Sequence, residues 1–323
     1  MNTKEPHFGV KENISTNVIF INGISRCGKS LLSNIISTFS RTEQLQFINL
    51  LENIVPALSM GVVDKGYAKS VMRAWMNELA YNQMISRNVN FRAADWTGIP
   101  NHPDEKIYFD RLSKEDGDSV VTELRKNNRF FPYMTHDMMV NLEHLNILEI
   151  DYKMLHIYRH PVDNVYSWFM RGLGDRYGND PRLFTLSIDY NGEVLPWYCS
   201  GYEEEWLRLQ PMERCVRTVI DLIEKSLNQY KKTANPERIH LLTYEDLAQN
   251  TEEEMQGISN FLHSSTTVAT LDYIKKAGCP RVLSTSDRMK KRQELKAGIS
   301  NELFIKLSEL SERYENGVYG LRI

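Results

Sequence analysis

The residues best suited to chemistry form one short motif near the N-terminus. Glycines let the backbone fold around an anion with its N–H groups pointing inward, and a helix that begins directly afterwards adds the positive end of its dipole. Although a tight turn between a strand and a helix is the simpler alternative, a complete match to G-x-x-x-x-G-K-S favours a site for a phosphorylated ligand. The matching residues are Gly23, Ile24, Ser25, Arg26, Cys27, Gly28, Lys29 and Ser30.

The side chains of this motif fit the same interpretation. Arg26 and Lys29 can add full positive charges beside an anion, and Ser30 can offer a hydroxyl to a phosphate or a metal ion. The motif alone does not say which phosphorylated molecule binds.

A second arginine is expected where parallel sheets bind ligands. Residues 153–158 are predicted to form a core strand, and Arg159 follows them directly. Pro161 is typical of a first helical turn, so Ser167 is expected two turns into the next helix. The two side chains can then converge on one anion. The alternatives are an ion pair for Arg159 and an ordinary helical position for Ser167.

A parallel sheet is needed to bring these residues together. Short apolar runs predict core strands at 18–21, 153–158 and 238–243, with a further short strand at 129–131. Long segments with helical periodicity lie between them. The predicted fold class is therefore α/β, a parallel β-sheet of the phosphate-loop type flanked by helices on both faces.

The remaining segments suggest how this domain is organised. We expect a flexible leader over residues 1–16 and a single α/β domain over 17–323. Residues 171–202 are rich in Gly, Pro, Asp and Tyr and are predicted to form a lid over the substrate. Residues 43–58 are predicted to be helical. The basic stretch 278–298 is predicted to be a glycine-bounded loop, which is either a solvated surface or a clamp for a nucleotide.

The segment around Arg159 resembles the sulfotransferases that use 3′-phosphoadenosine 5′-phosphosulfate (PAPS). In that family a core strand ends at an Arg, a Pro follows, and a Ser lies eight residues after the Arg, as Arg159, Pro161 and Ser167 do here. Two further stretches agree, in the expected order. Thr135-His136 resembles the family's Thr-His pair, and residues 238–262 resemble its strand, Tyr-Glu-Asp-Leu turn and helix.

The resemblance implies a sulfotransferase with PAPS as donor, adenosine 3′,5′-bisphosphate as product and no required metal. It implies that Arg159 and Ser167 bind the 3′-phosphate and that His136 is the catalytic base. Arg26 and Lys29 would hold the 5′-phosphosulfate and stabilise the leaving phosphate, which makes them catalytic as well. The cofactor-binding residues that it implies are Ser25, Arg26, Cys27, Gly28, Lys29, Ser30, Arg159, Ser167, Tyr244, Arg288 and Lys296.

The chain departs from the family pattern at three places. Met134 and the residues before it lack the basic residue that the family often has near its Thr-His pair. Lys29 stands where the family usually has Thr. The family's C-terminal Arg-Lys-Gly, which holds the 3′-phosphate, has Lys296-Ala297-Gly298 as its nearest counterpart, with Arg288 and Lys290 as rivals.

Two other functions are compatible with the phosphate loop. A phosphate-loop kinase or other ATP-dependent phosphotransferase would use Lys29 and Ser30 with Mg²⁺, but the predicted core strands do not end in the Asp that such enzymes use to hold the metal. A non-catalytic nucleotide-binding protein becomes the better hypothesis if His136 is buried away from the loop.

Composition limits the partners and the location. The net charge of −3 gives no sign of a bulk nucleic-acid binder, and the four cysteines form no C-x-x-C pair, which favours a reducing compartment. A signal-peptide core and a bilayer-spanning run are both absent from the sequence. We therefore expect a cytoplasmic enzyme without stable membrane insertion, acting on a small-molecule or glycan acceptor. The sequence leaves the oligomeric state open.

Overall fold

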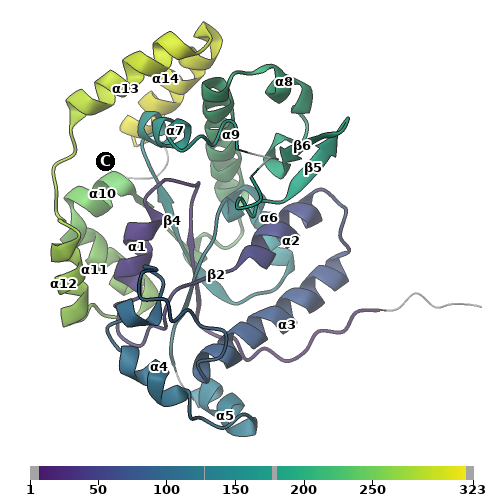
Figure 1. Ribbon diagram of the computed structural model, residues 1–323, viewed down its shortest axis with the longest axis vertical. Coiled ribbons are helices and arrows are strands. Elements are labelled where there is room, and N and C mark those ends of the chain that lie inside the picture. The colour runs from purple at the N-terminus through teal and green to yellow at the C-terminus, as the bar shows by residue number, and fades with distance from the viewer. Residues whose placement is uncertain (1–6, 127, 177–179, 318–323) are drawn as a thin grey trace, which may run out of the picture.

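A five-stranded parallel sheet forms the centre of the computed structural model, which describes residues 7–126, 128–176 and 180–317 (Figure 1). The expected α/β class is confirmed. Both β1 and β4 are buried along nearly their whole length, as continuous apolar runs predict for strands covered on both faces. In spatial order the strands are β2 (Gln46–Phe47), β3 (Phe131–Met134), β1 (Val18–Asn22), β4 (Tyr152–Tyr158) and β7 (Ile239–Thr243).

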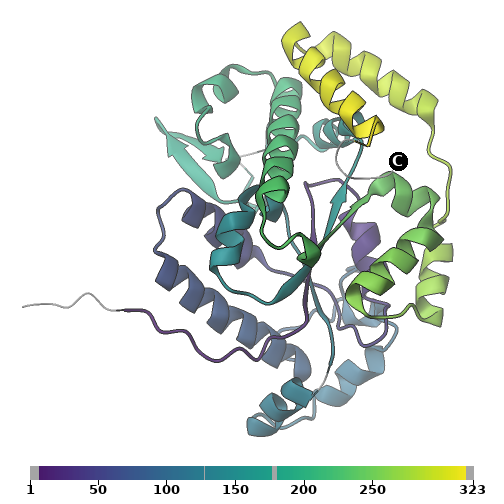
Figure 2. The same cartoon turned by 180° about the vertical axis from the view of Figure 1, so that it is seen from behind.

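Helices cover both faces of this sheet (Figure 1 and Figure 2). Successive side chains of a strand point to opposite faces, so Val18 and Phe20 pack into one apolar layer while Ile19 and Ile21 pack into the other. The first layer is formed by α2 (Asn49–Ser59), α3 (Lys65–Met84), α5 (Asp118–Lys126) and α6 (Leu142–Ile147). The second is formed mainly by α1 (Lys29–Ile36) and α11 (Thr251–Leu262), with α12 (Val268–Lys276) against α1.

A separate apolar cluster lies beyond the carboxyl ends of the strands. It surrounds Trp168 and includes Trp197, Tyr198 and Trp206. The helices that build it are α7 (Pro161–Phe169), α8 (Glu203–Arg208), α9 (Pro211–Lys232), α13 (Thr285–Gly298) and α14 (Asn301–Glu315). Two short helices, α4 (Glu105–Arg111) and α10 (Tyr244–Gln249), complete the described helices. No described helix is long and apolar enough to cross a bilayer.

The helix predicted over residues 43–58 is wrong at its start. The chain instead pairs with β3, through Thr42 beside Phe130 and Gln46 beside Tyr133, and α2 begins only at Asn49. A strand of two residues carries no periodic signal, and tertiary pairing overrides the local preference.

The loop predicted over residues 278–298 is also wrong in its conformation, because residues 285–298 form α13. Ser284 caps this helix by accepting a hydrogen bond from the N–H of Asp287 (3.2 Å), and the Lys, Arg, Gln, Glu and Leu residues that follow favour a helix.

The predicted lid segment contains regular structure. An antiparallel hairpin joins β5 (Ser187–Tyr190) to β6 (Glu193–Pro196), and residues 177–179 lie outside the described residues. Residues 1–6 of the predicted leader also lie outside them. The next residues run along α3, where Ser70 and Asn77 donate hydrogen bonds to the carbonyls of Gly9 and Glu12 (both 2.7 Å).

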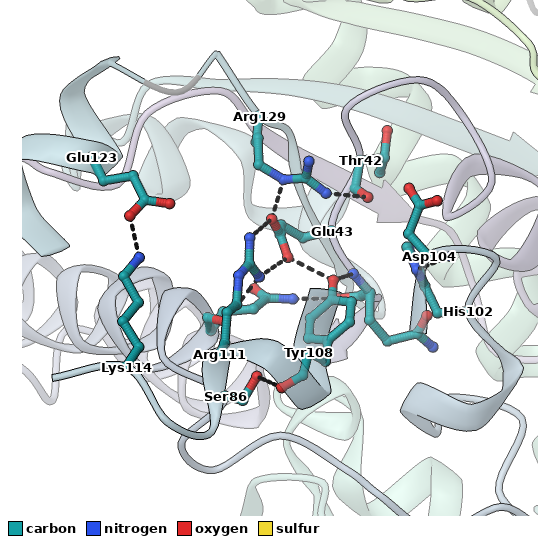
Figure 3. Close-up of polar contacts among 12 residues, drawn as sticks. Thr42, Glu43, Ser86, His102, Asp104, Tyr108, Arg111, Lys114, Glu123 and Arg129 are labelled. Atoms are coloured by element: carbon teal, nitrogen blue, oxygen red, sulfur yellow. Dashed lines mark hydrogen bonds and ion pairs between the residues drawn. The ribbon is translucent and has the colours of Figure 1, made fainter. Parts of the chain in front are cut away.

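A buried ion cluster holds the edge of the sheet next to β2 (Figure 3). The fully buried carboxylate of Glu43 accepts two hydrogen bonds from the guanidinium of Arg111 (2.8 and 2.9 Å), one from the hydroxyl of Tyr108 (2.6 Å) and another from Arg129. Tyr108 and Arg111 belong to α4, so the cluster ties α4 to the segment that leads into β2.

Candidate nucleotide and acceptor site

The phosphate loop joins β1 to α1 and depends on its two glycines. Gly28 has a φ of 108°, and a Cβ at this position would lie 2.4 Å from Cδ2 of Tyr244. A Cβ at Gly23 would lie 2.5 Å from the carbonyl oxygen of Ile157. Arg26 also adopts a left-handed conformation, with a φ of 68°, which is uncommon for a residue with a side chain. The loop is therefore tightly packed and specifically shaped.

Lys29 lies buried beneath this loop, with 4% of its surface exposed. Its ammonium donates hydrogen bonds to the loop's own carbonyls, those of Gly23 and Ile24 (2.8 Å for Ile24). Ser30 follows it at the exposed start of α1. Because the first N–H groups of a helix lack partners within the helix, the start of α1 suits an anion.

The structure places Arg159 and Ser167, the two predicted 3′-phosphate ligands, on either side of Arg26 of the loop. Nε of Arg26 donates to the hydroxyl of Ser167 (3.2 Å), and Arg159 donates to the backbone carbonyl of Arg26 (3.0 Å). The carbonyl of Ser25 accepts hydrogen bonds from Trp168 (2.6 Å) and from Asn164 on the same helix, α7. The phosphate loop is thus fastened to α7, and the predicted 3′-phosphate ligands lie at this junction.

Tyr244 stands beside the loop at the start of α10. The guanidinium of Arg159 stacks on its ring, 4.8 Å from the centroid, and its hydroxyl accepts a hydrogen bond from Arg281 (2.7 Å). Arg281 is exposed and was not among the predicted site residues. In the sequence, Arg281 belongs to no motif, and its place in a basic stretch is the only sign of a role in binding.

The other two predicted basic ligands have partners elsewhere. Arg288 donates to the carboxylates of Asp163 (2.7 Å) and Glu245 (3.4 Å), which fastens α13 to α7 and α10. Lys296 lies near the end of α13, 5.6 Å from the ring centroid of Phe304. A nucleotide-binding role for Arg288 or Lys296 stays a prediction.

A cavity of about 340 Å³ opens next to the phosphate loop. Polar groups line the part formed by the loop and the ends of the sheet, and apolar side chains supply much of the rest. Its lining consists of Ser25, Phe47, Asn49, Glu52, His136, Asp137, Trp168, Leu173, Arg182, Leu183, Phe184, Thr185, Trp197 and Tyr198.

His136 is the predicted base, and it lines this cavity together with Ser25 of the loop. One carboxylate oxygen of Glu52, on α2, accepts hydrogen bonds from the backbone N–H of His136 (2.7 Å) and from its Nδ1 (3.0 Å). A carboxylate at Nδ1 selects the tautomer that carries its proton there, which leaves Nε2 as an acceptor. Glu52 was missed from the sequence because it lies 84 positions from His136.

Asp137 is a second carboxylate that the sequence analysis did not single out. It also lines the cavity, and its Oδ1 is buried without a hydrogen-bond partner among the described residues. Burial raises the pKa of Asp137 to about 6, although the positive charges of His136 and Lys29 oppose this shift. Asp137 also adopts a left-handed conformation, with a φ of 58°.

Asn22, at the end of β1, fixes this pair of residues. Its Oδ1 accepts hydrogen bonds from the hydroxyl of Thr135 (3.0 Å) and the N–H of Met138 (3.1 Å), on either side of His136 and Asp137. Its Nδ2 lies 2.8 Å from Nδ1 of His156 on β4. One buried amide thus connects the segment after β3 to the two neighbouring strands.

One protein family matches most of the chain. A sulfotransferase domain matches residues 16–306. No curated protein sequence matches the chain significantly. Among solved structures, the chain is similar to the sulfotransferase domain from the Synechococcus PCC 7002 olefin synthase, with 15% identity, 96% of this chain and 98% of that chain covered, and a TM-score of 0.47.

Two further structures are similar at the same level. The sulfotransferase domain from the curacin biosynthetic pathway shows 14% identity over 87% of this chain and 97% of that chain, with a TM-score of 0.41. Sulfotransferase STF9 from Mycobacterium avium shows 12% identity over 90% of this chain and 78% of that chain, with a TM-score of 0.38. The assignment rests on the domain match, which spans most of the sequence: the chain belongs to the sulfotransferase family, whose members use PAPS.

Proposed function

We propose that the protein transfers a sulfuryl group from PAPS to a hydroxyl or amine of a small acceptor. The observation that carries this proposal is the junction of Arg26, Arg159 and Ser167 beside the phosphate loop. A ligand with phosphate groups at both ends of a nucleoside can satisfy the loop and this junction at the same time.

The residues present fit such a nucleotide. The N–H groups of the loop and of the start of α1 would hold the 5′-phosphosulfate, with the charge of Lys29 buried directly beneath them, while Arg159 and Ser167 would hold the 3′-phosphate. When bound, PAPS supplies a sulfuryl group attached to a phosphate that can leave. Lys29 and Arg26 would stabilise the charge that develops on that phosphate, because positive groups fixed in place before the reaction need no reorganisation.

His136 would act as the base. Its Nε2 would take the proton that the acceptor loses while the acceptor atom bonds to sulfur and the bond from sulfur to the 5′-phosphate oxygen breaks. Glu52 would keep the imidazole in the required tautomer and orientation. Because His136 lines the cavity beside Ser25, its position supports catalysis more than the non-catalytic alternative.

The cavity supports a small acceptor with an apolar part. Phe47, Trp168, Phe184 and Trp197 can cover such a body, while the polar groups near the loop receive its reacting hydroxyl or amine.

Calorimetric titration tests the proposal. We expect adenosine 3′,5′-bisphosphate to bind at least about tenfold more tightly than 5′-AMP, because charge-assisted hydrogen bonds to a 3′-phosphate contribute about 1.5–3 kcal/mol each. Arg159→Ala should reduce this preference, while Arg208→Ala, which removes an exposed arginine paired with Glu204, should keep it. Equal affinity for the two ligands, or tighter binding of ATP with Mg²⁺, would overturn the proposal.

A further inference from the structure

Three arginines gather beside the phosphate loop, and the described residues offer none of them a carboxylate partner. Arg26 contacts Ser167, and Arg159 contacts the backbone of Arg26. Arg171 lies four residues after Ser167, and its N–H donates to the carbonyl of Trp168 (3.0 Å), so the helical turn continues and Arg171 lies on the side of Ser167. Burial lowers the pKa of Arg26, and the positive charges of Arg171 and Arg159 lower it further.

Two arginines that follow Arg171 in the chain, by contrast, have a carboxylate partner. Arg176 and Arg182 both donate to the carboxylate of Asp180, at 2.9 and 2.8 Å. Arg171 lies at the start of the same irregular stretch and yet makes no such pair among the described residues. Three guanidinium groups without an anion repel one another, so their grouping is favourable only when a bound anion compensates for the repulsion.

We propose that Arg171 is a further ligand of the nucleotide's 3′-phosphate, and that this contact couples nucleotide binding to the wall of the acceptor cavity. This inference rests on the proposed function. Arg159 would approach the phosphate from the end of β4, Ser167 from α7, and Arg171 from the first turn beyond α7. Arg171 would thereby add a basic contact from the end of α7, whereas Arg288 of the C-terminal segment is already paired with carboxylates.

The coupling follows from the place of Arg171 in the chain. Trp168 and Leu173 both line the acceptor cavity, and the N–H of Leu173 donates to the carbonyl of Trp168 (3.2 Å). Arg171 lies inside this turn. A phosphate that holds Arg171 therefore restrains Leu173, which packs in one apolar cluster with Leu183 and Trp197 of the same cavity. Nucleotide binding would shape the cavity before the acceptor enters.

Calorimetry with Arg171→Ala tests the contact. We expect the variant to bind adenosine 3′,5′-bisphosphate about tenfold to a hundredfold more weakly, with unchanged affinity for 5′-AMP. Arg171→Lys keeps the charge but loses the planar guanidinium, so its affinity for the bisphosphate should lie between those of the wild type and Arg171→Ala. Arg208→Ala is the matched control and should behave as the wild type. If the wild type binds both ligands equally, the proposed function fails. If the wild type prefers the bisphosphate and Arg171→Ala keeps the full preference, only the role of Arg171 is overturned.

Hydrogen–deuterium exchange tests the coupling. In the wild type, saturating adenosine 3′,5′-bisphosphate should slow exchange of the amides in residues 183–198. In Arg171→Ala at saturating nucleotide, this slowing should be lost. Equal protection in both proteins would overturn the coupling even if the affinity changes.

Discussion

At the scale of single residues, His136 is accompanied by two carboxylates with different surroundings. Glu52 accepts two hydrogen bonds from His136 and fixes its orientation. Asp137, the next residue in the chain, has a buried oxygen without a partner among the described residues. Glu52 therefore suits a role in positioning His136, while Oδ1 of Asp137 can accept a hydrogen bond from a ligand.

Replacing the base gives the first test at this scale. We expect His136→Ala to lose at least about a hundredfold in turnover while keeping its affinity for adenosine 3′,5′-bisphosphate, because general-base catalysis typically contributes about 10²–10⁴-fold. Turnover is measured as nucleotide release with the best acceptor from a panel of aliphatic and phenolic alcohols. His7→Ala changes an exposed histidine of the N-terminal segment and serves as the control. Full turnover in His136→Ala would exclude it as the base.

The raised pKa of Asp137 should make the stability of the folded protein depend on pH. Its pKa of about 6 lies above the ordinary 3.8, so the folded protein binds this proton more tightly than the unfolded chain. The contribution to the free energy of unfolding is therefore complete below about pH 4 and is lost as the pH rises through about 6. Asp137→Asn cannot ionise, and Asn tolerates the left-handed backbone. We expect the variant to melt at a higher temperature than the wild type at pH 7.5 and to lose this advantage at pH 4.

Thermal unfolding at both pH values measures this difference. Asp151→Asn, at an exposed residue before β4, is the control and should show no such pH-dependent gain. An equal change in melting temperature for Asp137→Asn at both pH values would show that burial of its charge is not the cause.

At the scale of elements, the Glu43 cluster compensates for the shortness of β2. That strand has only two residues, yet Phe47 at its end and Glu52 on α2 both line the cavity. The cluster joins the segment before β2 to α4 through Arg111 and to the segment that leads into β3 through Arg129. Its ion pairs thus place one wall of the acceptor cavity.

Neutralising Glu43 should unfold the protein more easily. Glu43→Gln leaves two arginines without their buried counter-ion, and breaking a buried ion pair from one side typically costs about 3–5 kcal/mol. Glu204→Gln breaks an exposed pair, whose side chains are 67% and 75% exposed, and should cost about 0–1 kcal/mol. Urea unfolding at pH 7 compares the two. A cost for Glu43→Gln no larger than that for Glu204→Gln would contradict the role of the cluster.

Lowering the pH should destabilise the wild type as neutralising Glu43 does. Burial alone would raise the pKa of Glu43, but the hydrogen bonds and charges of Arg111 and Arg129 lower it overall. Because its folded pKa is below the ordinary 4.5, its contribution to stability is present at neutral pH and is lost as the pH falls below about 4.5 through the folded pKa. The gap in unfolding free energy between wild type and Glu43→Gln should narrow in that range.

At the scale of the whole molecule, the sequence predicted what local signals encode. The apolar runs of β1 and β4, the glycines of the loop and Pro161 at the start of α7 are all contiguous signals, and the structure has each element there. The pairing of Glu52 with His136 depends on how α2 packs on the sheet, which no local pattern reports.

The misassigned segments have equally physical causes. Only Leu295 of α13 is buried among the helix's residues, so the apolar periodicity that reveals a helix is missing there. Likewise, β2 exists because a sheet edge and a buried ion cluster hold it, although its own residues form no alternating pattern.

Because of Asn22, the distance from His136 to the phosphate loop depends on the register between β1 and β3. Its amide joins β1 to the residues around His136 and to β4. A slip of one residue between β1 and β3 would carry the imidazole about 3.3 Å along the strand, more than a hydrogen bond tolerates. Insertions between surface helices leave this alignment intact. A single residue added within β1 or β3 would instead move His136 away from the phosphate loop. Insertions in exposed loops away from the site are therefore expected to spare turnover, and an insertion within either of these two strands is expected to abolish it.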